Sequence, residues 1–153
     1  MAEIHEAFAG VTREGGVSWS ESDALDDYKS KRAQRKARES DTDTSWTELI
    51  NDESWDPDAH THCWCYLDAI GFRYYLPAGM VRCVRSGHDE GLSFWLAMRY
   101  PGDRRVYGET WSLLEERQCR CVARFLRYMA RVSQWLEQRD WVEAYESHWK
   151  QYD

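Results

Sequence analysis

The chain has 153 residues and a formal net charge of −7, a length that suits one domain over residues 1–153 with no need of a disulfide or metal. The negative charge argues against a general nucleic-acid binder, because such proteins gain most of their affinity by neutralising phosphates. The acidic start MAEIHEAFAG is unlike a secretory signal, and no window approaches the ~20 apolar residues of a membrane helix.

The first third of the chain predicts helices joined by polar connections. Residues 2–9 have the apolar spacing of a short helix. The sequence S-E-S-D at Ser20–Asp23 predicts a capping box for a second helix that runs to about Glu39, with acids in its first turns and Lys and Arg in its last. Residues 41–58 predict an acid-rich connection that contains a short helix over 45–51 and is pinned to the core by Trp46 and Trp55.

The middle of the chain predicts a helix, a stop and a restart. Residues 60–70 have a compact helical pattern, and Gly71 is a natural helix end. Residues 72–76 have extended character, and Pro77 suits the first position of the next helix. Residues 91–100 form a short apolar run that periodicity assigns neither to a strand nor to a helix.

The clearest predicted element covers residues 111–136. Large apolar residues recur there at three- and four-residue spacing: Trp111, Leu114, Cys121, Phe125, Met129, Val132 and Leu136. A short aromatic helix over 141–149 should follow. We therefore expect a mainly α-helical fold around one long helix of about seven turns in the C-terminal half, with at most a short strand pair from residues 72–75 and 91–107.

The run LDAIGFRYYLPAGM over residues 67–80 resembles the signature of a bacterial family known only as a domain of unknown function. Members of that family tend to read L-D-x-x-G-F-R-F-Y-L-P-A-Y-M, so Tyr74 and Gly79 depart from the usual Phe and Tyr. The matching positions are Leu67, Asp68, Gly71, Phe72, Arg73, Tyr75, Leu76, Pro77, Ala78 and Met80. Further likenesses are Arg38, Asp41, Trp46, Leu114 and Gln118. The resemblance implies no catalytic residue.

The signature also has a reading from its residues alone. Gly71 can adopt a left-handed conformation at a helix end, and Asp68 can pair with Arg73 across the turn. One hypothesis is that the signature only stabilises the fold, in which case replacing Arg73 by Ala should unfold the protein. The other is that Arg73 and Tyr75 form the floor of a ligand or partner site.

Five arginines of the predicted long helix repeat at 3-4-3-4 spacing: Arg117, Arg120, Arg124, Arg127 and Arg131. At 100° per residue they occupy an arc of roughly 80° beside the apolar stripe. They predict either an exposed face paired with acids from the second helix and the 41–58 connection, or a groove for anions, acidic partners or nucleic acid.

Cysteine and histidine cluster in one short segment with ligand types that suit zinc: His60, His62, Cys63 and Cys65. The C-x-C spacing, which recurs at Cys119 and Cys121, is not the usual C-x-x-C of zinc sites. Side chains two apart on a helix also diverge by about 200°. We therefore expect buried structural thiols, reduced in a cytoplasm, and predict no metal, cofactor or catalytic residue.

These features together favour a soluble cytoplasmic interaction module that acts through a protein partner, such as an immunity-type or accessory protein. Its acids would neutralise a basic partner, and some of its nine Trp and nine Tyr would anchor the contact. A nucleic-acid or phosphate-ligand binder that uses the five arginines is an alternative. A small enzyme or metal protein is a second alternative, and the oligomeric state stays open.

Overall fold

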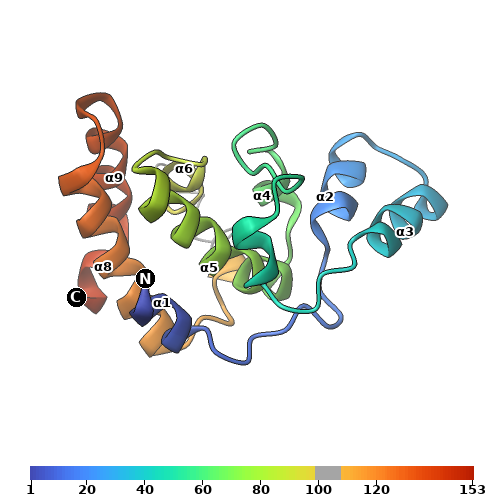
Figure 1. Cartoon of the computed structure of the whole chain (residues 1–153), viewed down its shortest axis with the longest axis horizontal. Coiled ribbons are helices and arrows are strands. Elements are labelled where there is room, and N and C mark those ends of the chain that lie inside the picture. Colours follow the sequence, from blue (N-terminus) through green and yellow to red (C-terminus); the bar gives the residue numbers. More distant parts are fainter. Residues whose placement is uncertain (99–107) are drawn as a thin grey trace.

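The computed structural model describes residues 1–98 and 108–153, and every regular element in these two ranges is a helix (Figure 1). The predicted mainly α-helical class is confirmed. Figure 1 shows α2 and α3 at one end of the molecule, α8 and α9 at the other, and α5 between them. The elements include the α-helices α1 (Ala2–Ala7), α2 (Trp19–Asp26), α3 (Lys31–Ser40), α4 (Cys63–Tyr66), α5 (Ala69–Ser86), α6 (Leu92–Trp95), α8 (Glu116–Val132) and α9 (Trp135–Ser147), and the 3-10 helices η1 (Glu48–Asn51) and η2 (Trp149–Tyr152).

The centre of the fold is α5, not the helix in the C-terminal half that the sequence favoured. Every residue from Gly71 to Val81 except Arg73 is buried, so α5 is covered on almost all sides. A helix that is apolar all round belongs inside a protein, because each face needs cover. Asp68 caps its first turn by accepting the backbone N–H of Gly71 at 2.8 Å, and Gly87 ends it in a left-handed conformation.

From Ala69 onward the run at residues 67–80 is one continuous helix, and three sequence predictions about it are wrong. Gly71 does not end a helix, residues 72–76 are helical rather than extended, and Pro77 lies inside α5. The predicted strand at 72–75 is absent for the same reason. Of its partner segment, residues 92–95 form α6, and 99–107 lie outside the described residues.

Close packing, rather than an unusual backbone angle, requires glycine at position 71. Gly71 is not among the glycines with positive φ. A Cβ added to it would lie 2.4 Å from the carbonyl oxygen of Val17, which is far inside van der Waals contact. The segment before α2 thus crosses α5 at a point where only a bare backbone fits.

The predicted helix over 111–136 is confirmed only in its middle part. The helix α8 covers Glu116–Val132, and the chain turns at Ser133 before α9 packs back against α8. The predicted core residues Cys121, Phe125 and Met129 are buried. In contrast, Val132 and Leu136 are 48% and 77% exposed, because the turn at Ser133 carries the end of the apolar stripe out of the core.

The predicted second helix is also broken, into α2 and α3. The capping box is present two residues earlier than predicted, between Ser18 and Glu21. Tyr28 adopts a left-handed conformation with φ of 53°, and Ser30 then caps α3. The local competition between capping side chains and helix propagation explains the break.

The remaining short elements follow the sequence more closely. Helix α1 occurs as predicted, and the 41–58 connection is pinned by the buried side chains of Trp46 and Trp55. The helices predicted over 45–51 and 60–70 are reduced to η1 and α4.

Replacing Gly71 by Ala should destabilise the protein by about 1–3 kcal/mol, since overpacking against a backbone carbonyl cannot relax by side-chain rotation. Gly108→Ala is the matched control, because no atom lies within 4 Å of a Cβ there and its φ is not positive. Urea denaturation followed by Trp fluorescence measures both. Equal unfolding midpoints for the two variants would contradict the assigned close approach.

Candidate functional site

A pocket of about 330 Å³ lies between α2, the 41–58 connection and α5. Three buried aromatic residues, Trp19, Trp55 and Tyr75, line it. The ring of Trp19 is 5.3 Å from the rings of both Trp55 and Tyr75, and the latter two stack at 6.0 Å between centroids. Because each ring packs on the other two, the aromatic wall is held in one arrangement.

The rest of the pocket lining is strongly acidic. Four carboxylates line it, and no Lys, Arg or His side chain does. They come from a single stretch that begins at the end of α3 and passes through η1: Asp41, Asp43, Glu48 and Asp52. The pocket therefore combines aromatic faces with negative charge, which is the environment that favours a cation.

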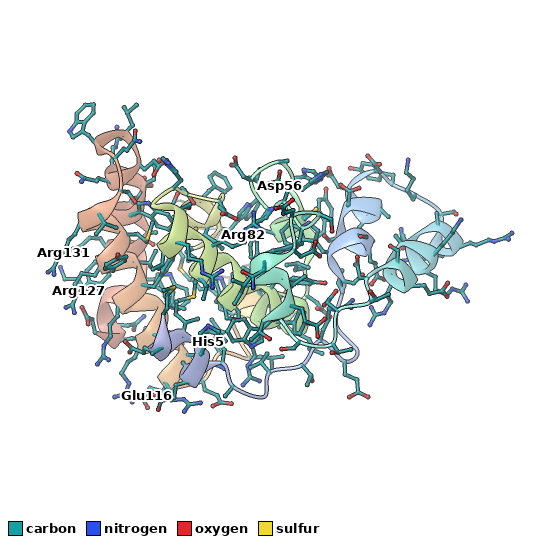
Figure 2. The ribbon with its side chains drawn as sticks, in the orientation of Figure 1. His5, Asp56, Arg82, Glu116, Arg127 and Arg131 are labelled. Atoms are coloured by element: carbon teal, nitrogen blue, oxygen red, sulfur yellow. The ribbon has the colours of Figure 1, made fainter. Side chains whose placement is uncertain are left out.

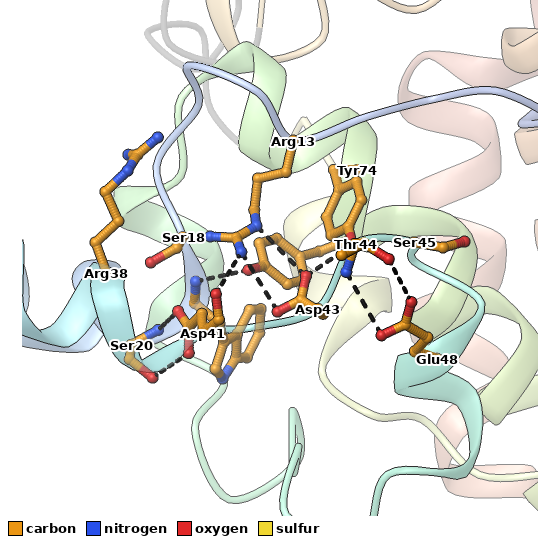
Figure 3. A network of polar contacts seen from close by, with 12 residues as sticks. Arg13, Ser18, Ser20, Arg38, Asp41, Asp43, Thr44, Ser45, Glu48 and Tyr74 are labelled. Atoms are coloured by element: carbon orange, nitrogen blue, oxygen red, sulfur yellow. Dashed lines mark hydrogen bonds and ion pairs between the residues drawn. The ribbon is translucent and has the colours of Figure 1, made fainter.

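Neutral donors hold the outer carboxylates in place (Figure 3). Asp41 accepts hydrogen bonds from the backbone N–H of Ser20 at 2.8 Å and from its hydroxyl at 2.6 Å. Glu48 accepts one from the hydroxyl of Thr44 at 2.7 Å. Such bonds orient the carboxylates and leave their charge uncompensated.

Asp52 is held in the same way, at the edge of the connection. It accepts hydrogen bonds from the hydroxyl of Ser54 at 2.6 Å and from its backbone N–H at 2.8 Å. The hydroxyl bond is the main reason why the pKa of Asp52 lies below its usual value. Asp52 is therefore ionised throughout the neutral range.

Asp43 is the exception, because it joins a partly buried ion pair. Its carboxylate accepts a hydrogen bond from the hydroxyl of Tyr74 at 2.7 Å. The same carboxylate lies 3.4 Å from the Nε of Arg13. The side chain of Arg13 is only 12% exposed. It also donates a hydrogen bond to the backbone carbonyl of Asp41 at 2.9 Å, and its guanidinium lies 5.8 Å from the centroid of the Tyr74 ring. Within the described residues, Arg13 is the one cation that pairs with a pocket carboxylate, and that carboxylate is Asp43. Arg82 reaches the same region through the backbone carbonyl of Asp52, to which it donates at 3.3 Å.

The two tyrosines of this network stay neutral. Burial is the largest cause of the raised pKa of both Tyr74 and Tyr75, followed for Tyr74 by its bond to Asp43. The hydroxyl of Tyr75 accepts the backbone N–H of Trp19 at 2.9 Å. Helix α5 thus fixes α2 through Tyr75 and the acidic connection through Tyr74.

The structure separates Arg73 and Tyr75, which the sequence placed in one site. Tyr75 lines the pocket, whereas Arg73 points to α8, where it donates to Gln118 at 3.0 Å and to Glu115 at 2.7 Å. Residues two apart on a helix diverge by about 200°, which accounts for the separation. The predicted pair of Asp68 with Arg73 is wrong, because Asp68 binds backbone N–H groups instead.

The five predicted arginines all lie exposed on α8, but four of them already bind groups of the same chain. Figure 2 shows Arg127 and Arg131 at the α8–α9 end of the molecule, far from Arg82 and Asp56. The partners are the carbonyl of Ala7 for Arg117, Glu116 for Arg120, Glu3 for Arg124 and Asp153 for Arg127. The predicted ion pairing thus occurs, but with acids from α8 itself and the chain ends rather than from residues 20–58.

Sequence reasoning missed most of the pocket. Trp19, Arg13 and Asp43 carry no local pattern, and they lie 26 to 56 residues before the start of α5, the helix that brings them together. The available signals were the family likeness at Asp41 and the hypothesis that Tyr75 forms part of a site. Of the predicted Cys and His cluster, three residues meet near α2, namely His60, His62 and Cys63.

All five cysteines are free, and four of them are buried. Burial is the main cause that raises the pKa of the Cys63 and Cys121 thiols to about 12. This agrees with the predicted structural thiols. Cys65 alone among the five is exposed.

The chain belongs to the Family of unknown function (DUF6714), which it matches over residues 1–153. The membership predicted from residues 67–80, in a family without assigned activity, is confirmed. No curated protein and no solved structure matches the chain. None of the helices in the described ranges has the length and apolar character required to cross a bilayer.

Replacing Arg73 by Ala should lower the free energy of unfolding by about 1–2 kcal/mol, because Gln118 and Glu115 lose a charged donor that ties α8 to α5. This is a smaller effect than the unfolding predicted from the sequence, since the core of α5 stays packed. Arg120→Ala is the control, as its exposed pair with Glu116 should change stability by less than about 0.5 kcal/mol. Thermal melts in which the two variants are indistinguishable would contradict the role of Arg73.

Proposed function

We propose that this member of DUF6714 is a cytoplasmic binding module that acts through a protein partner, and that its acidic pocket receives a basic side chain of that partner. The observation that carries the proposal is the pocket lining, with four carboxylates beside three aromatic rings and no basic residue. The five free cysteines support a reducing compartment.

A Lys or Arg side chain suits this pocket for two physical reasons. Ionised carboxylates form strong charge-assisted hydrogen bonds with ammonium and guanidinium groups. Aromatic faces attract the same cations and also cover their methylene stems. Two guanidinium groups of the chain itself already lie over rings of this region, Arg13 at 5.8 Å from Tyr74 and Arg82 at 5.6 Å from Trp55.

Two further features support a protein rather than a small cationic ligand. The net charge of −7 would draw a basic macromolecule toward the chain from a distance. Large apolar side chains are also left uncovered at the start of α9, where Trp135 and Leu136 are 81% and 77% exposed. Uncovered groups of this size are typical of surfaces that contact other proteins. An immunity-type or accessory protein that masks a basic partner fits this description.

The arginines of α8 favour no second function. Four of them already bind a carboxylate or a carbonyl of the same chain. A phosphate ligand would have to displace those partners, and the overall negative charge would oppose its approach.

The double variant E48Q/D52N should weaken binding of a basic peptide about tenfold, which corresponds to ~1.4 kcal/mol. The probe is a fluorescent Gly-Ser peptide that carries three Arg, compared by anisotropy with matched peptides that carry three Lys, Gln or Glu. The Arg and Lys peptides should bind, more weakly at higher salt, and the other two should not. Both substitutions remove a charge while they preserve side-chain shape.

The matched control is E6Q/D58N, which removes the same charge from two exposed acids that do not line the pocket. This control should bind the Arg peptide nearly as tightly as the native chain does. Equal losses in both double variants would show general charge attraction without a pocket. A DNA duplex that binds more tightly than the Arg peptide at the same salt would overturn the proposal in favour of the α8 arginines.

A further inference from the structure

Four potential metal ligands from two separate segments meet beside α2, away from the acidic pocket lining. Asp23 lies on α2. His60 and His62 lie on the turn that leads into α4, and Cys63 is the first residue of that helix. One ligand atom from each residue can be chosen so that all four atoms lie within 4.8 Å of one another. Asp23 is the member that the sequence alone did not associate with the others, because 37 residues separate it from His60.

The individual distances are centred on one carboxylate oxygen. The Oδ1 of Asp23 lies 2.9 Å from the Nε2 of His62, 3.5 Å from the Nδ1 of His60 and 4.0 Å from the Sγ of Cys63. With zinc bonds of about 2.0–2.1 Å to nitrogen or oxygen and about 2.3 Å to sulfur, ligand atoms of a tetrahedral site are about 3.3–3.6 Å apart. The observed distances bracket that range.

Small side-chain movements are enough to complete a tetrahedron. Asp23, His60 and His62 are each between 40% and 51% exposed, so their rings and carboxylate can rotate without disturbing the core. Cys63 is buried at the start of α4, so the core holds this one ligand in position. Asp26 adds a second carboxylate 3.9 Å from His62.

Cys65 does not belong to this cluster, although the sequence grouped it there. It lies two residues beyond Cys63 on α4 and is exposed, in keeping with the divergence of about 200° between such positions. The chain therefore supplies a natural control thiol, adjacent in sequence and separate in space.

We propose that Asp23, His60, His62 and Cys63 bind one zinc ion. Thiolate and imidazole ligands select zinc over magnesium or calcium, which prefer oxygen. Four ligands from the protein fill a tetrahedral shell, so the ion would have a structural role rather than offer an open position to a substrate. It would tie the turns before α4 to α2, an arrangement now held by the hydrogen bond between His62 and Asp23.

This inference stands on residues that do not line the acidic pocket, and the failure of either proposal leaves the other intact. The two are nevertheless neighbours in the fold. Trp19 of the pocket begins α2, and its ring lies 5.1 Å from that of Trp64, the residue after Cys63. A zinc ion at Asp23 would therefore stiffen one wall of the pocket.

The test uses the full chain without a histidine tag, stripped of metal with a chelator and then titrated with cobalt and with zinc. Addition of cobalt should produce intense visible d–d bands and a thiolate-to-cobalt charge-transfer band. Both should stop growing once one equivalent of cobalt per chain has been added. Zinc should displace the cobalt and raise the melting temperature of the protein. Elemental analysis after dialysis should find one zinc per chain.

The variants C63S and C65S form the matched pair. C65S should retain the charge-transfer band and the zinc-induced stabilisation, whereas C63S should lose the band and bind zinc at least tenfold more weakly. D23N, which alters a partly exposed side chain, should also weaken zinc binding at least tenfold, and circular dichroism confirms that it folds. No cobalt bands in the native chain, or a charge-transfer band that survives in C63S and disappears in C65S, would overturn the proposal.

Discussion

The nearly complete burial of α5 between Gly71 and Val81 is the constraint on which the rest of the structure depends. A helix with apolar residues on every face has to be enclosed, and the other elements are arranged to enclose it. Burial also dictates where its few polar groups go. The hydroxyls of Tyr74 and Tyr75 cannot remain without partners inside a core, and they bind Asp43 and the backbone of Trp19.

The candidate site is a consequence of those two hydroxyl bonds. Through Tyr74 the acidic connection is held against α5, and Arg13 compensates the one carboxylate that is drawn inward. The other acids stay at the rim, fixed by neutral donors and close to the rings of Trp19 and Trp55. Core packing has thus produced a pocket that is rigid, aromatic and negatively charged, and such a pocket is suited to a cationic group.

Sequence patterns predicted the class of the fold and the middle of α8 because apolar periodicity is a local property, visible in residues such as Cys121, Phe125 and Met129. The patterns were wrong at Gly71 and Pro77. These residue types usually end a helix, but tertiary packing keeps both of them inside α5. Apart from Tyr75, sequence patterns did not predict the pocket, because the residues that line it are distant from one another in the chain. The Cys and His cluster was visible in sequence, but only the fold shows that Asp23 joins it and Cys65 does not.

The most direct test of the pocket is a nuclear magnetic resonance titration of the indole N–H signals with the three-Arg peptide. Each of the nine Trp residues has one such signal, so the binding surface can be located without any substitution. A cation seated among the four carboxylates should shift the signals of Trp19 and Trp55 in a saturable way and leave the exposed Trp135 unchanged. Shifts confined to Trp135, or no saturable shift at Trp19 and Trp55, would contradict the proposed role of the pocket.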